Sequence, residues 1–152
     1  MTHFNHFDLL APVYEWLATP PDVTILASLA GLPAPGLVLD LGGGTGRVAQ
    51  ALSKASPTIV VADEAMGMLR RAARKPGLVA VACQAEALPF RRGAFRAEVM
   101  VDTFHHVRDH SASLGEMLRV LADGGSLVIE EPDIRQMPVR VVALVERLAL
   151  MR

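Results

Sequence analysis

Blocks of apolar residues alternate with mixed polar and apolar segments along this chain. Five short apolar runs, several rich in β-branched residues, have the length and pattern of strands buried on both faces. These strands are predicted over residues 37–41, 58–62, 78–83, 97–101 and 126–130. The remaining segments with apolar residues at helical spacing are predicted as helices over residues 23–30, 48–54, 65–75, 111–121 and 138–151.

This alternation of strands and helices predicts an α/β fold. Successive right-handed βαβ units give a Rossmann-like, doubly wound, mostly parallel sheet with helices on both faces. We expect a helical lid over residues 1–35, followed by one structural unit, the Rossmann-like domain, over residues 36–152.

Composition narrows the function classes. The chain has 152 residues, of which 51% are hydrophobic and 20% charged, and its formal net charge is −1. It carries no basic stripe, so we expect no nucleic-acid partner. Cys83 is the single cysteine, and no apolar stretch reaches the ~20 residues of a membrane helix. These features favour a cytoplasmic protein without a membrane span.

Carboxylates mark the ends of three predicted strands. Asp40, Asp63 and Asp102 lie at or near the carboxyl ends of the first, second and fourth strands. Acids are also common at strand ends simply because these ends are exposed to solvent. Ligands of open α/β sheets bind beyond the same ends, and a glycine-rich loop follows Asp40, so we predict a binding site there.

The loop over residues 42–46 limits which ligand this is. Its glycines allow a ligand to approach the backbone, and the next helix begins with unpaired N–H groups. No Lys-Ser/Thr pair follows, which excludes a P-loop. Residues 44–49 fit a dinucleotide pattern, so a nicotinamide-dependent oxidoreductase stays open. Asp40 would repel a pyrophosphate and attract a ligand carrying an amino group and a sulfonium.

A family resemblance supports the second type of ligand. Residues 38–47 (VLDLGGGTGR) resemble motif I of class I SAM-dependent methyltransferases, and residues 63–69 are similar to their second motif. Residues 85–90, Phe95 and residues 119–125 resemble the ubiquinone/menaquinone-biosynthesis-like group, methyltransferase type 11, as do residues 7–15. The resemblance implies S-adenosyl-L-methionine (SAM) as cofactor and methyl transfer to a small-molecule acceptor.

The resemblance also implies roles for individual residues. The cofactor-binding set comprises Asp40, Gly42, Gly43 and Gly44 at the methionine end, Asp63, Glu64 and Met68 at the ribose, Gln84, Ala85 and Glu86 at the adenine, Asp102 and Thr103 facing the methyl group, and Tyr14 closing over the cofactor. Gln84 replaces the usual Asp, although its carbonyl can still accept from the adenine amino group. Arg96 replaces another Asp, which we interpret as a surface change.

A histidine cluster follows the fourth strand. His106 and His110 would share a helical face, as a metal pair requires, but a polar loop with Ser111 as helix N-cap is the favoured interpretation, and we expect no metal. His105 and His106 are candidates for a general base acting on an acceptor hydroxyl. Cys83 is interpreted as a small buried residue.

The predicted elements lack the two C-terminal strands that are usual in the resembled family. Their absence leaves the fifth strand near an exposed edge, so we expect either a chain truncated after Arg152 or a homodimer that covers this edge. A non-catalytic SAM-binding or dimerisation module therefore remains an alternative to the methyltransferase.

Overall fold

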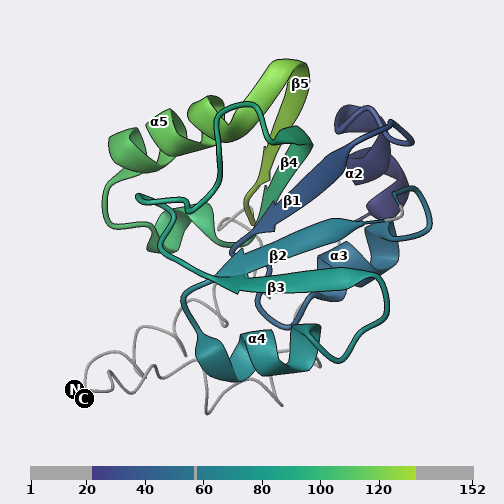
Figure 1. Cartoon of the computed structure of the whole chain (residues 1–152), viewed down its shortest axis with the longest axis horizontal. Helices are drawn as coiled ribbons and strands as arrows, with labels where there is room; N and C mark the ends of the chain where they lie inside the picture. Colours follow the sequence, from purple (N-terminus) through teal and green to yellow (C-terminus); the bar gives the residue numbers. More distant parts are fainter. Residues whose placement is uncertain (1–21, 57, 133–152) are drawn as a thin grey trace.

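Five parallel strands form the centre of the molecule in the computed structural model, which describes residues 22–56 and 58–132. The strands are β1 (Leu37–Leu41), β2 (Ile59–Asp63), β3 (Leu78–Ala82), β4 (Phe95–Val101) and β5 (Leu121–Glu130). Their order is β3-β2-β1-β4-β5 (Figure 1). The chain runs outward from β1 to β3 and then returns to the other side of β1. The strand order thus reverses between β1 and β4. This topological switch point is the place where such sheets bind ligands.

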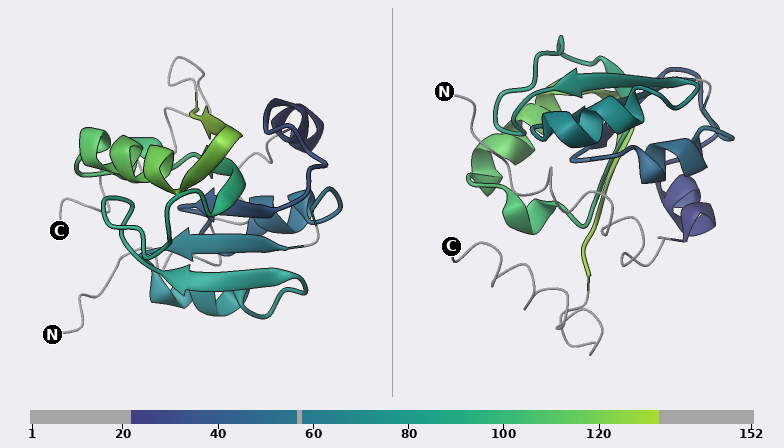
Figure 2. Two further views of the ribbon diagram at one scale, coloured as in Figure 1. Left: turned by 45° about the horizontal axis from the view of Figure 1, so that its top comes forward. Right: turned by 90° about the horizontal axis from the view of Figure 1, so that it is seen from below.

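Helices cover both faces of this sheet, as predicted. The elements are α2 (Val23–Leu29), α3 (Arg47–Leu52), α4 (Met66–Ala72), α5 (His110–Val120) and the short 3₁₀ helix η1 (Phe104–His106). Apolar residues of α2, α3 and α4 pack in one cluster with the sheet, whereas those of α5 pack in a second cluster on the opposite face. Figure 2 shows α5 on one side of β5 and the pair α2 and α3 on the other.

Alternation along the strands divides the core between these clusters. In β1, Val38 joins the cluster of α2 to α4, while Leu39 and Leu41 join the cluster of α5. Because both faces are covered, the strands are nearly continuous apolar runs. Two buried acids interrupt these runs, Asp40 in β1 and Glu98 in β4. Glu98 is fully buried, and neither of its carboxylate oxygens has a hydrogen-bond partner. Burial raises the pKa of Glu98 to about 8.

The helix after β4 begins earlier than predicted. Helix α5 starts at His110, and the Asp109 side chain caps it by accepting from the Ala112 N–H at 2.9 Å. The prediction that Ser111 is the N-cap is therefore wrong. His106 belongs to η1 and His110 to α5, so the two histidines do not lie on one helix.

The fifth strand also begins earlier than predicted. Leu121 pairs with Phe95, and Ser126 pairs with Ala97, so residues 122–125 form an irregularity between the two pairs. Gly124 has φ +68°, and the Arg96 guanidinium donates to its carbonyl oxygen. Arg96 therefore links β4 to this irregularity of β5.

Several sequence predictions lie outside the described residues: the helix over residues 138–151, Tyr14 and the segment 7–15. Within residues 22–56 and 58–132, no helix has the length and apolar character needed to cross a membrane. β3 and β5 are the outer strands of the sheet as far as the structure describes it.

Candidate functional site: a cavity at the switch point

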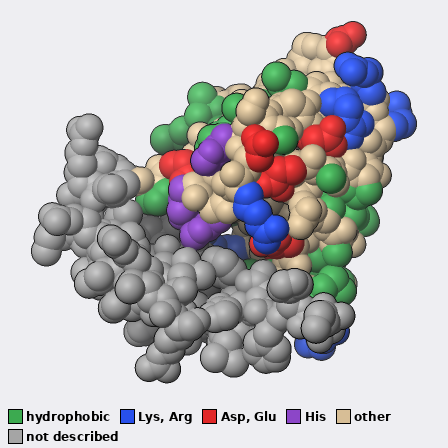
Figure 3. All heavy atoms as spheres, turned by 90° about the vertical axis from the view of Figure 1, so that its left-hand side faces the viewer, with side chains coloured by type: hydrophobic (Ala, Val, Ile, Leu, Met, Phe, Trp, Pro, Cys, Tyr) green, Lys and Arg blue, Asp and Glu red, His purple; other side chains and the backbone are tan. Residues whose placement is uncertain are grey.

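A cavity opens beyond the carboxyl ends of the strands, where the strand order reverses. All the predicted cofactor-binding residues that the structure describes line it: Asp40, Gly42, Gly43, Gly44, Asp63, Glu64, Met68, Gln84, Ala85, Glu86, Asp102 and Thr103. They come from four separate strand ends, yet the fold brings them to one place. On the face shown in Figure 3, histidine, acidic and basic side chains gather beside a hollow.

The glycine loop forms one wall of the cavity with its backbone. Gly42 has φ +70° and Gly44 has φ +53°, both in the left-handed region that favours glycine. A Cβ on Gly42 would lie 2.1 Å from Cγ2 of Thr103, so the loop after β4 packs directly on this residue. The Gly44 N–H donates to Oδ2 of Asp63 at 2.9 Å. A side chain at Gly42 would separate the glycine loop from the loop after β4, and a Cβ on Gly44 would lie 3.0 Å from Sδ of Met68.

The Asp40 side chain lies against the glycine loop and links it to α3. Its side chain is buried, Oδ2 accepts from the Ala49 N–H of α3 at 3.0 Å, and a Cβ on Gly43 would lie 2.5 Å from its carboxyl group. Burial raises the pKa of Asp40 to about 7, and nearby Asp63 adds to this, whereas the Ala49 N–H and Arg47 oppose it. From the sequence, Asp40 was predicted only as a ligand-facing acid at the methionine end of the cofactor, so its contact with α3 was missed.

Asp63 ends β2 and connects two loops. Its Oδ1 accepts from the Ala65 N–H at 2.7 Å, and its Oδ2 accepts from Gly44. Burial raises the pKa of Asp63, and these backbone N–H groups partly offset the rise. Each carboxylate oxygen has two lone pairs, so both can accept a further hydrogen bond from a ligand hydroxyl.

The segment after β3 supplies another wall of the cavity, and side chains of α5 hold this segment in place. Glu116 accepts from the Leu88 N–H at 2.8 Å, and Arg119 donates to the carbonyls of Leu88 and Phe90 at 2.9 and 2.8 Å. The i, i+3 spacing of Glu116 and Arg119 on the predicted helix was the signal available in the sequence. Cys83 lines the cavity, and burial raises the pKa of its thiol to about 11, so it is a poor nucleophile.

The loop between β4 and α5, residues 102–109, completes the cavity. Asp102 has φ +53°, the one positive φ of a non-glycine residue in the described part of the chain. His106 lines the cavity and His105 does not, although their ring centroids are 3.9 Å apart. Burial lowers the pKa of His106, and nearby His105 adds to this. His110 bonds to the Phe104 carbonyl through Nε2 at 3.0 Å.

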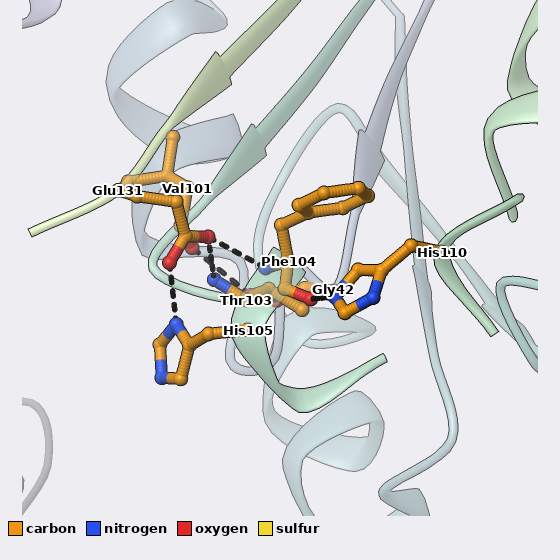
Figure 4. Close-up of polar contacts among 7 residues, drawn as sticks. All are labelled: Gly42, Val101, Thr103, Phe104, His105, His110 and Glu131. Atoms are coloured by element: carbon orange, nitrogen blue, oxygen red, sulfur yellow. Dashed lines mark hydrogen bonds and ion pairs between the residues drawn. The ribbon is translucent and has the colours of Figure 1, made fainter. Parts of the chain in front are cut away.

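Two carboxylates from distant segments hold this β4–α5 loop. Glu86 Oε1 accepts from the N–H groups of Arg108 and Asp109 at 3.0 and 3.2 Å. Glu131, which follows β5, accepts from Thr103 and Phe104 and faces His105 (Figure 4). From the sequence, Glu86 was predicted only at the adenine. The contacts of Glu86 and Glu131 with this loop were not predicted, because neither contact is local in sequence.

Further residues line the cavity that the sequence analysis did not assign to the site. Arg47 and Arg108 add basic groups, while Met100, Val101 and Val107 add apolar surface. Arg108 lies 3.7 Å from the Glu64 carboxylate in an exposed ion pair. No group of three or more metal-ligating side chains occurs within the described ranges.

A doubly wound parallel sheet, a glycine loop after β1 and an acid at the end of β2 define a nucleotide-type binding domain. Sequence comparison identifies the class further, because residues 39–129 match the family described as "Methyltransferase domain". The chain belongs to this family of class I SAM-dependent methyltransferases, and SAM is the cofactor of the family.

Individual relatives agree with this assignment. The chain is 43% identical over 105 residues to a demethylmenaquinone methyltransferase of Thermus thermophilus, covering 64% of this chain and 48% of the relative. It is 41% identical over 98 residues to a malonyl-[acyl-carrier protein] O-methyltransferase of Geobacter sulfurreducens, covering 60% and 36%. The chain thus spans about half the length, or less, of these curated relatives.

A solved structure is similar over most of the chain. A SAM-dependent methyltransferase of Thermotoga maritima, described as a possible histamine N-methyltransferase, superposes with a TM-score of 0.75 at 25% identity. The match covers 93% of this chain and 68% of that one. The Rossmann-like fold predicted from the sequence is confirmed.

Proposed function

We propose that this chain binds SAM in the cavity at the β1–β4 switch point and transfers its methyl group to a small, uncharged or apolar acceptor. The observation that carries the proposal is the convergence of the predicted cofactor residues on one cavity in a chain of the methyltransferase family. When bound, SAM supplies an electrophilic methyl group on a positively charged sulfur.

The residues present fit this ligand. Asp63 has lone pairs left for the ribose hydroxyls, and the backbone of Gly42 to Gly44 leaves no side chain between the loop and a ligand. Gln84 lines the cavity next to Ala85 and offers a carbonyl to the adenine amino group without a charge. The acids around the cavity favour a cation over the pyrophosphate of a nicotinamide cofactor.

The acceptor side of the cavity supports a small apolar molecule. Met100, Val101 and Val107 line it with apolar surface. The relatives are named for demethylmenaquinone and for malonyl-[acyl-carrier protein]. We therefore propose a quinone precursor or a similar metabolite as the first acceptor class to test. His105 and His106 remain the candidates for receiving its proton.

Calorimetric titration tests the cofactor. We expect SAM and S-adenosylhomocysteine to bind the parent chain, NADH not to bind, and Asp63→Ala to weaken SAM binding at least tenfold, because it removes a hydrogen-bonded carboxylate. Asp123→Ala is the matched control, since Asp123 is exposed and is not among the residues that line the cavity. Binding of NADH alone would favour the oxidoreductase. SAM binding without methyl transfer to any tested acceptor would favour the non-catalytic module.

Other parts of the proposal are independent of the cofactor. A second copy pairing along β5 would cover the outer edge of the described sheet, and sedimentation of the purified chain tests this homodimer. The lid over residues 1–35 stays a prediction; within it, Leu26 of α2 packs in the core. The absence of a nucleic-acid partner and the cytoplasmic location also stay predictions.

A further inference from the structure

Glu131 makes contacts to three successive residues of the β4–α5 loop. Its Oε1 accepts from the backbone N–H groups of Thr103 and Phe104 at 3.1 and 2.6 Å. Its Oε2 lies 2.5 Å from Nδ1 of His105. Figure 4 shows the carboxylate between the backbone of this loop and the imidazole ring. The two oxygens therefore have different partners, one the backbone and the other the histidine.

This division fixes where the imidazole carries its proton. An ionised carboxylate can only accept hydrogen bonds, so Nδ1 of His105 must donate. The carboxylate cannot turn away, because two backbone N–H groups bind its other oxygen. A neutral imidazole that is protonated on Nδ1 has its lone pair on Nε2. The Nε2 atom of His105 is then the basic nitrogen of the ring.

We propose that Glu131 is a positioning residue that holds His105 as the Nδ1–H tautomer and so leaves Nε2 as the proton acceptor of the ring. This inference rests on the proposed function and deepens it, because it selects His105 from the two candidate bases. His105 is adjacent to the cavity through His106, whose ring lies against it and lines the wall. His105 remains 42% exposed, so a molecule entering from solvent can reach it.

The proposal specifies the acceptor as a molecule with a hydroxyl group. The acceptor oxygen forms a bond to the methyl carbon, and the carbon–sulfur bond breaks with its electron pair left on sulfur. The hydroxyl proton passes to Nε2 of His105. The products are the methyl ether, neutral S-adenosylhomocysteine and an imidazolium ion, whose charge Glu131 stabilises across the Nδ1–H bond.

Nitrogen NMR of the histidine rings tests the tautomer without any acceptor. In the ¹⁵N-labelled chain, at a pH where imidazoles are neutral, we expect His105 to show a protonated Nδ1 and an unprotonated Nε2. Its signals are assigned by their loss in His105→Asn. In Glu131→Gln, the amide oxygen keeps the two backbone N–H groups and the amide NH₂ faces the ring. The NH₂ group is a donor, so the proton of His105 should move to Nε2.

Glu130→Gln is the matched control, because it makes the same change one residue earlier. We expect it to keep the Nδ1–H tautomer of the parent. A parent ring protonated on Nε2, or the same tautomer in Glu131→Gln and the parent, would overturn the proposal.

SAM titration separates this inference from the proposed function. SAM should bind the parent chain and Glu131→Gln with affinities within about threefold of each other, because Glu131 is not among the residues that line the cavity. A loss of SAM binding in Glu131→Gln alone would make Glu131 a structural part of the cofactor site and overturn the positioning role. A parent chain that does not bind SAM would instead overturn the proposed function, while the tautomer result would stand.

Discussion

The two halves of the cavity are held together in opposite ways. In the half formed by the ends of β1 and β2, the acids Asp40 and Asp63 accept from N–H groups of the loops and helix that directly follow these strands. In the half formed by the β4–α5 loop, the N–H groups belong to the loop and the acids come from elsewhere. Glu86 follows β3 and Glu131 follows β5.

This difference separates stability from fine geometry. The first half is part of the buried core, since Asp40 is 1% exposed and supports α3. A change there should affect folding and SAM binding together. The second half lies near the surface and is fixed by a few long-range hydrogen bonds, each worth about 1–3 kcal/mol. Changes there should alter the loop while the sheet remains intact.

The largest expected effect is a dependence of stability on pH that the buried acids Glu98 and Asp40 cause. This dependence has to be known before the two halves are compared at different pH values. Burial raises the folded-state pKa of Glu98 from 4.5 to about 8 and that of Asp40 from 3.8 to about 7. The folded state therefore binds these protons more tightly than the unfolded state does. For each acid, stability falls as pH rises from the unfolded-state pKa to the folded-state pKa. For Glu98 alone we expect a loss of up to about 4 kcal/mol between pH 5 and 8.5.

Urea unfolding at pH 5, 7 and 8.5 measures this loss. Glu98→Gln keeps the shape of the protonated acid and should remove most of the decline, whereas Asp123→Asn at an exposed site should leave it unchanged. Asp40→Asn should remove a second part of the decline in stability, the part that occurs mostly below pH 7. If Glu98→Gln retains the parent slope, the carboxyl group of Glu98 is not the cause.

The contact between the halves provides the second prediction. In Gly42→Ala, the new methyl group would lie 2.1 Å from Cγ2 of Thr103 on a backbone with φ +70°. We expect a loss of about 2–4 kcal/mol in the free energy of unfolding and no measurable SAM binding. Gly115→Ala in α5 meets nothing within 4 Å and should stabilise the chain by about 0.5–1 kcal/mol. Equal effects of the two substitutions would show that Gly42 does not join the halves.

The third prediction tests the independence of the second half. Glu86→Ala removes the acceptor of the Arg108 and Asp109 N–H groups, so amide hydrogen exchange at these residues should accelerate about fivefold, as expected for a cost of about 1 kcal/mol. SAM affinity should change less than tenfold. Glu64→Ala removes the exposed ion pair with Arg108 at 3.7 Å but no acceptor of these two N–H groups, so it should leave both exchange rates unchanged. Faster exchange throughout the sheet in Glu86→Ala would show that the halves are not independent.

The sequence could predict the first half because its residues are contiguous. The glycine loop and Asp40 lie within ten residues, and β1 was predicted with its observed limits at Leu37 and Leu41. The end of β2 brings Asp63 to the same place because parallel strands finish at one edge of a sheet. The sheet order itself required only alternating elements and right-handed crossovers.

The remainder depends on contacts between distant residues. Glu131 and His105 are 26 positions apart, and no local pattern links them. Glu98 was missed because the apolar run around it predicts a buried strand whether or not one acid interrupts it. The start of β5 was wrong because the Asp-Gly-Gly sequence is typical of a turn, yet residues 122–125 continue the strand as an irregularity facing β4.

The smallest expected effect distinguishes two capping residues in the second half. Asp109 accepts from the Ala112 N–H at 2.9 Å, whereas the sequence favoured Ser111 as the N-cap. Asp109→Ala should cost about 1 kcal/mol in the free energy of unfolding, because it leaves a helix N–H unpaired. Ser111 is exposed within the first turn of α5, so Ser111→Ala should change stability by less than about 0.3 kcal/mol. Urea unfolding of both variants at one pH makes the comparison. A larger cost for Ser111→Ala than for Asp109→Ala would mean that Ser111 is the N-cap of α5. The hydrogen bond from the Asp109 N–H to Glu86 would then lie before the start of the helix.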